Sequence, residues 1–272
     1  MRLGLSSFYA RHAVAGGGGL AASQAMLASS AALGAQLVQF CENLPLTALP
    51  EDDLRVLQAQ AAELGLGLEV GTRGVDPDNL SAQARMAARV GSRCLRVMLD
   101  LDDLALIRRR LTDVLPALHD LGLTLALENS YWVGSADLAT LVRALDDPAV
   151  GACLDTANSL GRLEPPAETL ANLAPLAAQV HLKDFVVDKV AIGYHITGRP
   201  LGQGLLDLPA VVSALGPRAG ALDYCLEYWM DPEPDAAATY AKEQRWLAES
   251  LAAARTSLGR FPRLESDRAF GP

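Results

Sequence analysis

The chain has 272 residues, of which 50% are hydrophobic, and its formal net charge at pH 7 is −9. This length suits one large α/β domain, because α/β barrels of roughly 200–250 residues fold as single domains. The acidic balance and the lack of a basic stripe argue against a nucleic-acid partner, and no uncharged apolar window of about 18 residues predicts a membrane span. We therefore expect a protein that binds neither nucleic acid nor a membrane.

The cysteines lack the pattern of a metal or redox site. Cys41, Cys94, Cys153 and Cys225 each lie within a short apolar run, without CxxC spacing. We interpret them as small buried hydrophobic side chains in a reducing compartment. Because the N-terminus also lacks the charged and apolar regions of a secretory signal, we predict a cytoplasmic location.

Short apolar runs alternate with longer helical patterns along the chain. The candidate strands, in order, cover residues 2–7, 35–42, 66–73, 92–100, 123–129, 150–157, 178–185 and 221–229. Between two of them, residues 102–121 carry apolar side chains at helical spacing. Gly65, Gly91 and Gly122 each end a helical pattern just before a strand, as left-handed caps do.

Eight such units are compatible with a closed barrel or with a doubly wound open sheet. An open sheet that binds a dinucleotide would carry a GxGxxG turn directly after its first strand. Residues 16–19 are all glycine but lack this register, so we interpret them as a mobile loop. We predict the α/β fold class and a (β/α)8 TIM barrel, as a single domain over residues 1–272 with an irregular tail at residues 259–272.

Four polar residues follow apolar runs at the ends of successive predicted strands: Glu128, Asp155, His181 and Glu227. The carboxyl ends of barrel strands meet on one face, so these side chains should converge there. Buried carboxylates repel one another unless a cation compensates them. We therefore predict one divalent metal ion, Mn, Mg, Co or Zn, bound by all four. The alternative is that the two glutamates form ion pairs with Arg73, Arg96 or Lys183 and bind no metal.

The segments LALEN, GACLDTAN, VHLKDF, GRPLGQGLLD and LEYW, in this order, resemble the xylose isomerase-like sugar phosphate isomerase/epimerase superfamily. The resemblance implies a TIM barrel, the same four metal ligands, and an acid/base role for Glu128 and Glu227. Many members carry a histidine where this chain has Asn158, which can hydrogen-bond but cannot titrate. The combination with DTANS looks closer to a branch that includes 3-oxo-isoapionate decarboxylase.

Further residues are candidates for substrate contacts. Lys183 shares the strand face of His181, and we expect it to stabilise negative charge on the substrate, whereas Asp184 points the other way and should brace a loop. Residues 186–205, rich in Gly and Pro, should form a long loop that acts as a lid. The other candidates for binding the substrate are Asn158, Arg199, Arg73, Arg96, Tyr9 and His12.

These features predict a metal-dependent enzyme that acts on a keto-sugar or sugar acid through a metal-stabilised enediolate. A sugar isomerase or epimerase is the first expectation, and a 3-oxo sugar acid decarboxylase (a lyase) is the alternative. A non-catalytic sugar-binding barrel is a further alternative. A DNA-repair endonuclease of this fold is disfavoured, because the chain is acidic and has only four histidines, whereas those enzymes bind three metals with many histidines. The expected partner is a small carbohydrate or sugar-acid substrate, and the resemblance allows a homodimer.

Overall fold

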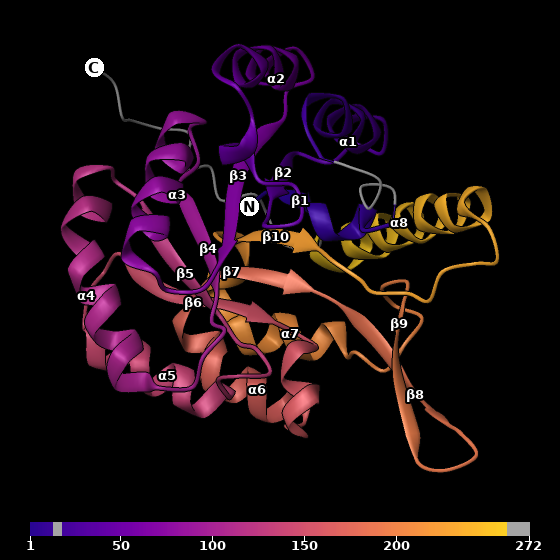
Figure 1. Cartoon of the computed structure of the whole chain (residues 1–272). Coiled ribbons are helices and arrows are strands. Elements are labelled where there is room, and N and C mark those ends of the chain that lie inside the picture. Colours follow the sequence, from indigo (N-terminus) through magenta and orange to yellow (C-terminus); the bar gives the residue numbers. More distant parts are fainter. Residues whose placement is uncertain (13–17, 260–272) are drawn as a thin grey trace.

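A computed structural model describes residues 1–12 and 18–259, and it confirms the (β/α)8 barrel (Figure 1). Eight parallel strands close in the order β1-β10-β7-β6-β5-β4-β3-β2. They are β1 (Leu3–Ser6), β2 (Leu37–Phe40), β3 (Gly67–Arg73), β4 (Cys94–Met98), β5 (Thr124–Glu128), β6 (Val150–Asp155), β7 (Ala177–Leu182) and β10 (Asp223–Leu226). The mobile-loop prediction for residues 16–19 falls partly, and the tail from residue 260 wholly, outside the described residues.

Helices cover the outside of the strands (Figure 1). The α-helices are α1 (Leu20–Ala32), α2 (Glu51–Glu63), α3 (Pro77–Arg89), α4 (Leu104–Asp120), α5 (Ser135–Leu145), α6 (Pro166–Leu173), α7 (Leu208–Leu215) and α8 (Ala236–Leu258). Short 3-10 turns are η1 (Ser7–Ala10), η2 (Leu46–Ala48), η3 (Asn158–Arg162), η4 (Ala174–Leu176) and η5 (Gly216–Gly220). No helix in the described part of the chain is long and apolar enough to cross a membrane.

Helix α4 shows why the sequence pattern folds as it does. Its buried positions are Ile107, Leu111, Val114 and Leu118, whose spacing of three to four residues places them on one helical face. The Asp103 carboxylate caps the first turn by accepting the N–H of Leu106 at 2.9 Å. The helix predicted over residues 102–121 is confirmed to within two residues at each end.

The interior of the barrel is polar at its N-terminal end. The Arg2 guanidinium contacts the Asp223 carboxylate at 2.6 Å and the Glu69 carboxylate at 2.9 Å. The Gln179 amide donates to Glu69 at 2.6 Å. Burial raises the pKa of Glu69, and Arg2 lowers it by less, so the net shift is upward. These contacts tie the chain just before β1 to β3, β7 and β10.

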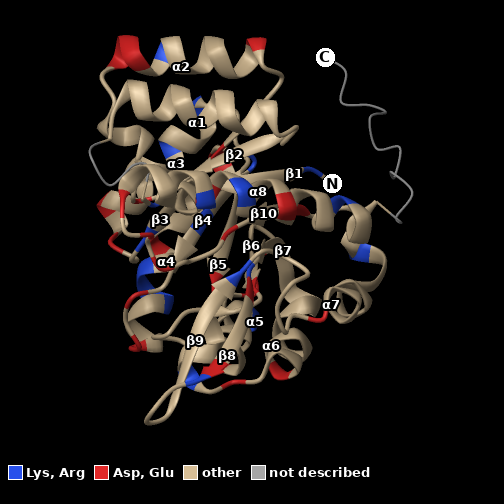
Figure 2. Cartoon of the chain, turned by 90° about the vertical axis from the view of Figure 1, so that its right-hand side faces the viewer, with Lys and Arg blue, Asp and Glu red and all other residues tan. Residues whose placement is uncertain are grey.

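The expected long loop over residues 186–205 is wrong in part, because much of it forms an antiparallel hairpin. Strands β8 (Asp184–Lys189) and β9 (Tyr194–Arg199) pair along six residues each and extend away from the barrel (Figures 1 and 2). The turn between them contains Gly193 with φ +90°, a conformation that favours glycine. At the base of the hairpin, a side chain on Gly198 would overlap the carbonyl oxygen of Trp229, which follows β10. Glycine therefore lets the hairpin pack directly on the chain beyond β10.

Asp184 organises the chain that returns from the hairpin. Its buried carboxylate accepts the backbone N–H groups of Gly202 at 2.8 Å, Gly204 at 2.9 Å and Leu206 at 2.9 Å. It also accepts the N–H of Phe185 at 2.8 Å. The loop-bracing arrangement expected for Asp184 is the one found.

We expect Asp184→Ala to lower the free energy of unfolding by about 3 kcal/mol, because buried N–H donors lose a charged acceptor. Asp188→Ala is the matched control, since Asp188 lies in the same hairpin with its side chain 52% exposed and pairs with Arg199 at 3.3 Å. Urea unfolding of both variants checks this. Equal stability of the two variants would show that the Asp184 contacts do not hold the loop.

Candidate metal and substrate site

The four predicted metal ligands meet at the C-terminal end of the barrel. Glu128 ends β5, Asp155 ends β6, His181 lies in β7, and Glu227 follows β10 directly. All four are buried, and one possible ligand atom from each lies within 4.8 Å of all the others. These strands are neighbours in the barrel, so closure of the sheet brings the ends of distant segments together.

Asp155 is held by the backbone that follows it. One carboxylate oxygen, Oδ1, accepts the N–H groups of Ala157 at 2.8 Å and Asn158 at 2.7 Å. The Asn129 side chain accepts the Asp155 N–H at 2.8 Å and donates to its carbonyl oxygen at 2.9 Å. This arrangement fixes the side chain and directs the second oxygen, Oδ2, toward Lys183.

Lys183 joins three of the site residues through its ammonium group. Its Nζ lies 2.9 Å from Asp155 Oδ2 and 2.5 Å from Glu227 Oε2, and donates to Asn158 Oδ1 at 3.0 Å. Burial lowers the pKa of Lys183, but the Asp155 and Glu227 carboxylates raise it by more. Lys183 therefore stays a cation at the centre of the site.

Arg96 is the second buried cation. Its Nε lies 2.5 Å from Glu128 Oε2, and its Nη1 lies 3.1 Å from Glu42 Oε2. Burial raises the pKa of Glu128, but Arg96 and His181 lower it by more, so this carboxyl is ionised. For Asp155, burial raises the pKa, Lys183 lowers it and Glu128 raises it, with a net value of about 6. Both ion pairs that the metal-free alternative required are thus present.

The His181 ring has polar atoms that these ion pairs leave without hydrogen bonds. Both ring nitrogens are buried, and neither has a hydrogen-bond partner in the described part of the chain. The nearest carboxylate oxygens, those of Glu128 and Glu227, lie 3.2 and 3.6 Å from Nδ1 without the alignment of a hydrogen bond. Burial lowers the pKa of His181, but the Glu128 and Glu227 carboxylates raise it by more. A divalent ion would take the place of the ring proton, because an imidazole nitrogen is a metal ligand and a buried ring nitrogen without a hydrogen bond is costly.

The charge balance agrees with a divalent ion. Four carboxylates, those of Glu42 and the three acidic members of the cluster, face the two cations Arg96 and Lys183. A divalent cation would neutralise the two negative charges that remain. Three carboxylates and one imidazole suit Mn, Mg, Co or Zn without choosing among them. The residues therefore fit a metal, and the Cys153 thiol also lies within reach of Glu128 and His181.

A cavity of about 230 Å³ opens beside the cluster. Its lining residues are Phe8, Arg11, Arg96, Met98, Asn158, Lys183, Glu227, Tyr228 and Trp229. Asn158 also donates to Glu128 Oε1 at 3.2 Å, so it lies between the cluster and the cavity. The volume is below the roughly 300–1,000 Å³ of pockets for drug-sized ligands, which indicates a small ligand.

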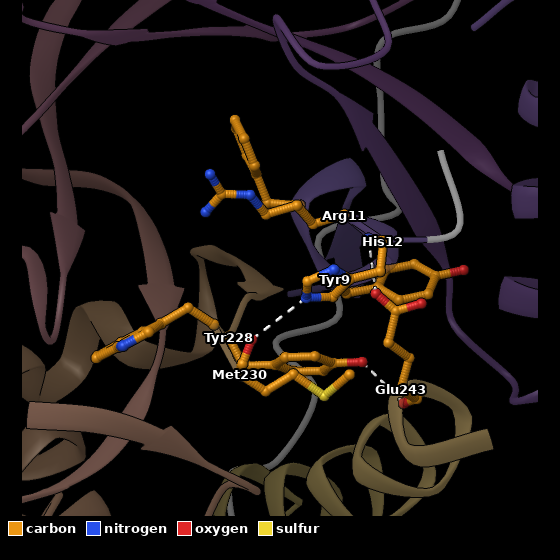
Figure 3. A pocket seen from close by; sticks show the side chains of 8 residues that line it. Tyr9, Arg11, His12, Tyr228, Met230 and Glu243 are labelled. Atoms are coloured by element: carbon orange, nitrogen blue, oxygen red, sulfur yellow. Dashed lines mark hydrogen bonds between the residues drawn. The ribbon is translucent and has the colours of Figure 1, made fainter. Parts of the chain in front are cut away.

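The other predicted substrate residues do not line this cavity. Tyr9 and His12 line a neighbouring cavity of about 190 Å³, where the His12 ring contacts the Met230 carbonyl oxygen at 3.2 Å (Figure 3). Arg73 points its half-exposed side chain toward Asp100 at 3.8 Å, and Arg199 pairs with Asp188 within the hairpin. Arg73 was predicted from its strand end and Arg199 from the loop after the seventh predicted strand, but in the structure each lies beside a nearby acidic residue.

Two residues of the site are absent from the sequence-based set. The Ser6 hydroxyl, at the end of β1, donates to Glu227 Oε1 at 2.5 Å. Arg11 lines the cavity from the turn after η1. The available signal was their position at the end of the first strand and in the turn that follows it, where the sequence analysis selected only Tyr9 and His12.

Comparison with known proteins places the chain in a family. The model of the xylose isomerase-like TIM barrel family matches residues 27–250. The chain belongs to this family. A 3-oxo-isoapionate decarboxylase from Pectobacterium atrosepticum is 32% identical over 237 residues, which are 84% of this chain and 85% of that protein.

Solved structures of xylose isomerase-like barrels share the fold. A D-psicose 3-epimerase structure, determined in the presence of D-fructose, superposes with a TM-score of 0.73 at 14% identity and covers 95% of this chain and 100% of its own. A xylose isomerase-like TIM barrel protein from Mycobacterium smegmatis, in complex with magnesium, superposes with a TM-score of 0.67 at 18% identity. The match covers 88% of this chain and 90% of that protein. The predicted family and fold are therefore confirmed.

We expect this xylose isomerase-like barrel to purify with, or take up, about one divalent ion per chain, and His181→Ala to lower that content several-fold. His119→Ala is the matched control, because His119 lies in α4 and pairs on the surface with Asp147 at 2.9 Å. Elemental analysis after dialysis against each metal gives the content. Equal metal content in the two variants would contradict the site.

We expect Arg96→Met to destabilise the fold by about 3–5 kcal/mol, because it leaves the Glu128 carboxylate buried without its cation. Arg73→Met, which removes a half-exposed arginine from the adjacent strand, should cost much less. Denaturant unfolding in the presence of a chelator measures both. A small effect of Arg96→Met would mean that another group compensates Glu128.

Proposed function

We propose that this protein is a divalent-metal-dependent decarboxylase that acts on a 3-oxo sugar acid. The observation that carries the proposal is the charge of the cavity, whose lining includes three cationic side chains, Arg11, Arg96 and Lys183, and the single carboxylate of Glu227. Because Arg96 and Lys183 already pair with carboxylates of the site, Arg11 is the cation of this lining that suits an anionic substrate better than a neutral sugar. The decarboxylase from Pectobacterium, at 32% identity over most of both chains, supports the same assignment.

The proposed decarboxylation does not begin with removal of a proton from carbon, so it needs no strong base for its first step. In a 3-oxo acid, the bond to the carboxyl carbon breaks, carbon dioxide leaves, and the electron pair is delocalised onto the ketone oxygen as an enediolate. The enediolate then takes up one proton at carbon to give a ketose. A divalent metal held by the four-residue cluster supplies Lewis-acid stabilisation of that oxygen.

Lys183 is suited to stabilise the negative charge of this reaction. Its ammonium lies at the wall of the cavity, between Asp155 and Glu227, so its charge faces the place where negative charge develops. The Asp155 and Glu227 carboxylates raise its pKa, so this charge stays in place both before and after carbon dioxide leaves. Asn158 accepts a hydrogen bond from Lys183 and donates one to Glu128, so it fixes these two side chains relative to each other.

An isomerase or epimerase acting on a ketose is the second candidate. Its support is the pair Glu128 and Glu227, which approach the His181 ring from two strands and match a pair that removes and returns a proton. In this chain, however, each glutamate contacts a fixed cation, Arg96 in one case and Lys183 in the other. A carboxylate held by a cation is a weaker base, so a reaction without initial proton abstraction fits better.

We expect the metal-loaded protein to release carbon dioxide from a 3-oxo sugar acid, and Lys183→Met to lower kcat by about 100-fold or more. Lys189→Met is the control, because Lys189 lies exposed near the hairpin turn. Carbon dioxide release and metal content are measured for all three proteins.

The outcomes separate the candidates. Exchange of a ketose C–H with D2O, without carbon dioxide release, would replace the decarboxylase by the isomerase or epimerase. Ligand binding without either reaction, and unchanged in Glu128→Gln, would identify a non-catalytic binding barrel.

A further inference from the structure

Arg11 differs from the other cations of the cavity because it pairs with no carboxylate in the described part of the chain. Arg96 and Lys183 each contact two carboxylates. Arg11 is exposed, and among the residues that the structure describes it has no ion-pair or hydrogen-bond partner. A cation that lines a cavity without an acidic partner is available for an anionic ligand.

The backbone on the N-terminal side of Arg11 is fixed in place. The Ser7 hydroxyl donates to Asn43 Oδ1 at 2.5 Å and accepts the N–H of Cys41 at 2.9 Å, which fastens η1 to the chain after β2. Tyr9, in the same turn, is only 1% exposed. Arg11 follows as the C-cap of η1 with helical backbone angles.

The backbone on the C-terminal side is fastened to α8 and to the chain after β10. The His12 N–H donates to the Glu243 carboxylate at 2.9 Å, and its ring contacts the Met230 carbonyl oxygen. Figure 3 shows both contacts, with the Arg11 guanidinium projecting away from them. The position of Arg11 is therefore set from both sides while its charged end stays free.

Arg11 also lies where two cavities meet. The cavity beside the metal cluster and the neighbouring one share the lining residues Phe8, Arg11, Tyr228 and Trp229. Tyr228 is nearly buried, and its hydroxyl donates to the Glu243 carbonyl oxygen at 2.8 Å, so its ring forms a fixed wall. Arg11 therefore borders both cavities beside a fixed aromatic wall.

We propose that Arg11 binds the substrate carboxylate and is the residue that selects a sugar acid over a neutral sugar. The proposal rests on the proposed function and adds the group that recognises the anion. A guanidinium can donate two parallel N–H bonds to one carboxylate, which orients the carboxyl plane as well as attracting it. With the carboxylate at Arg11, the ketone end of a short 3-oxo acid points toward Lys183 and Glu227 in the same cavity.

This assignment also accounts for product release. When the bond to the carboxyl carbon breaks, neutral carbon dioxide leaves and the negative charge moves from the carboxylate at Arg11 to the ketone oxygen. Protonation of the enediolate at carbon then removes this charge, so the ketose product carries no anion. Arg11 then attracts the substrate but not the product. Wild-type protein should accordingly show weak inhibition by the ketose product compared with its affinity for the acid.

The test compares Arg11→Gln and Arg11→Lys with Arg55→Gln, a control on α2 whose arginine side chain is 65% exposed. Each metal-loaded protein is assayed for KM and kcat with the 3-oxo acid, and for inhibition by the ketose product. Binding of erythronate, a sugar acid without a ketone, is measured by calorimetry as an activity-independent readout. Sorbitol and a sugar phosphate serve as neutral and phosphate probes.

We expect Arg11→Gln to raise KM and to weaken erythronate binding by about 10- to 100-fold, with little change in product inhibition. Arg11→Lys should fall between, since an ammonium keeps the charge but not the paired N–H geometry. The control should match wild type. Thermal melting of all variants verifies that they fold.

The two proposals fail in different ways. If wild type decarboxylates the acid but Arg11→Gln leaves KM and erythronate binding unchanged, the role of Arg11 is wrong and the function stands. If no carbon dioxide is released but erythronate binding depends on Arg11, the function is wrong and the carboxylate site stands. Absence of erythronate binding to wild type, or an Arg11→Gln effect confined to the sugar phosphate, would overturn the carboxylate assignment.

Discussion

The mutual repulsion of carboxylates at the barrel mouth is the constraint on which the rest of the site depends. Glu128, Asp155 and Glu227 are buried within one small cluster, and Glu42 contacts the same arginine as Glu128. Without compensation, this arrangement would cost several kcal/mol per ion. Arg96 and Lys183 offset half of the charge, and a divalent ion bound to His181 and the three carboxylates of the cluster would offset the remainder.

The barrel supplies the rigidity that such a cluster needs. Closure between β1 and β10 places Ser6 against Glu227, although the two residues are 221 positions apart in the chain. Backbone donors fix Asp155, and the Asp184 carboxylate holds the chain that returns from the hairpin.

The same charge balance supports the proposed decarboxylation over proton abstraction from a ketose. Cations in contact with both glutamates favour a reaction that starts with the loss of a carboxyl group, because the first step then needs no strong base. Arg11 has a different position, since it faces the cavity without an acidic partner in the described chain. Arg96 and Lys183 therefore neutralise the carboxylates of the cluster, whereas Arg11 is available for an anionic ligand.

The sequence by itself determined the barrel and its four-residue cluster, because each ligand follows an apolar run whose end must lie at the barrel mouth. It also placed Lys183 and Asp184 on opposite faces, since side chains alternate along an extended chain. Only the tertiary structure decided the hairpin, the acidic partners of Arg73 and Arg199, and the positions of Ser6 and Arg11. These depend on which acidic groups lie nearby in space, and residue order does not specify the partners of long side chains on loops and strand ends.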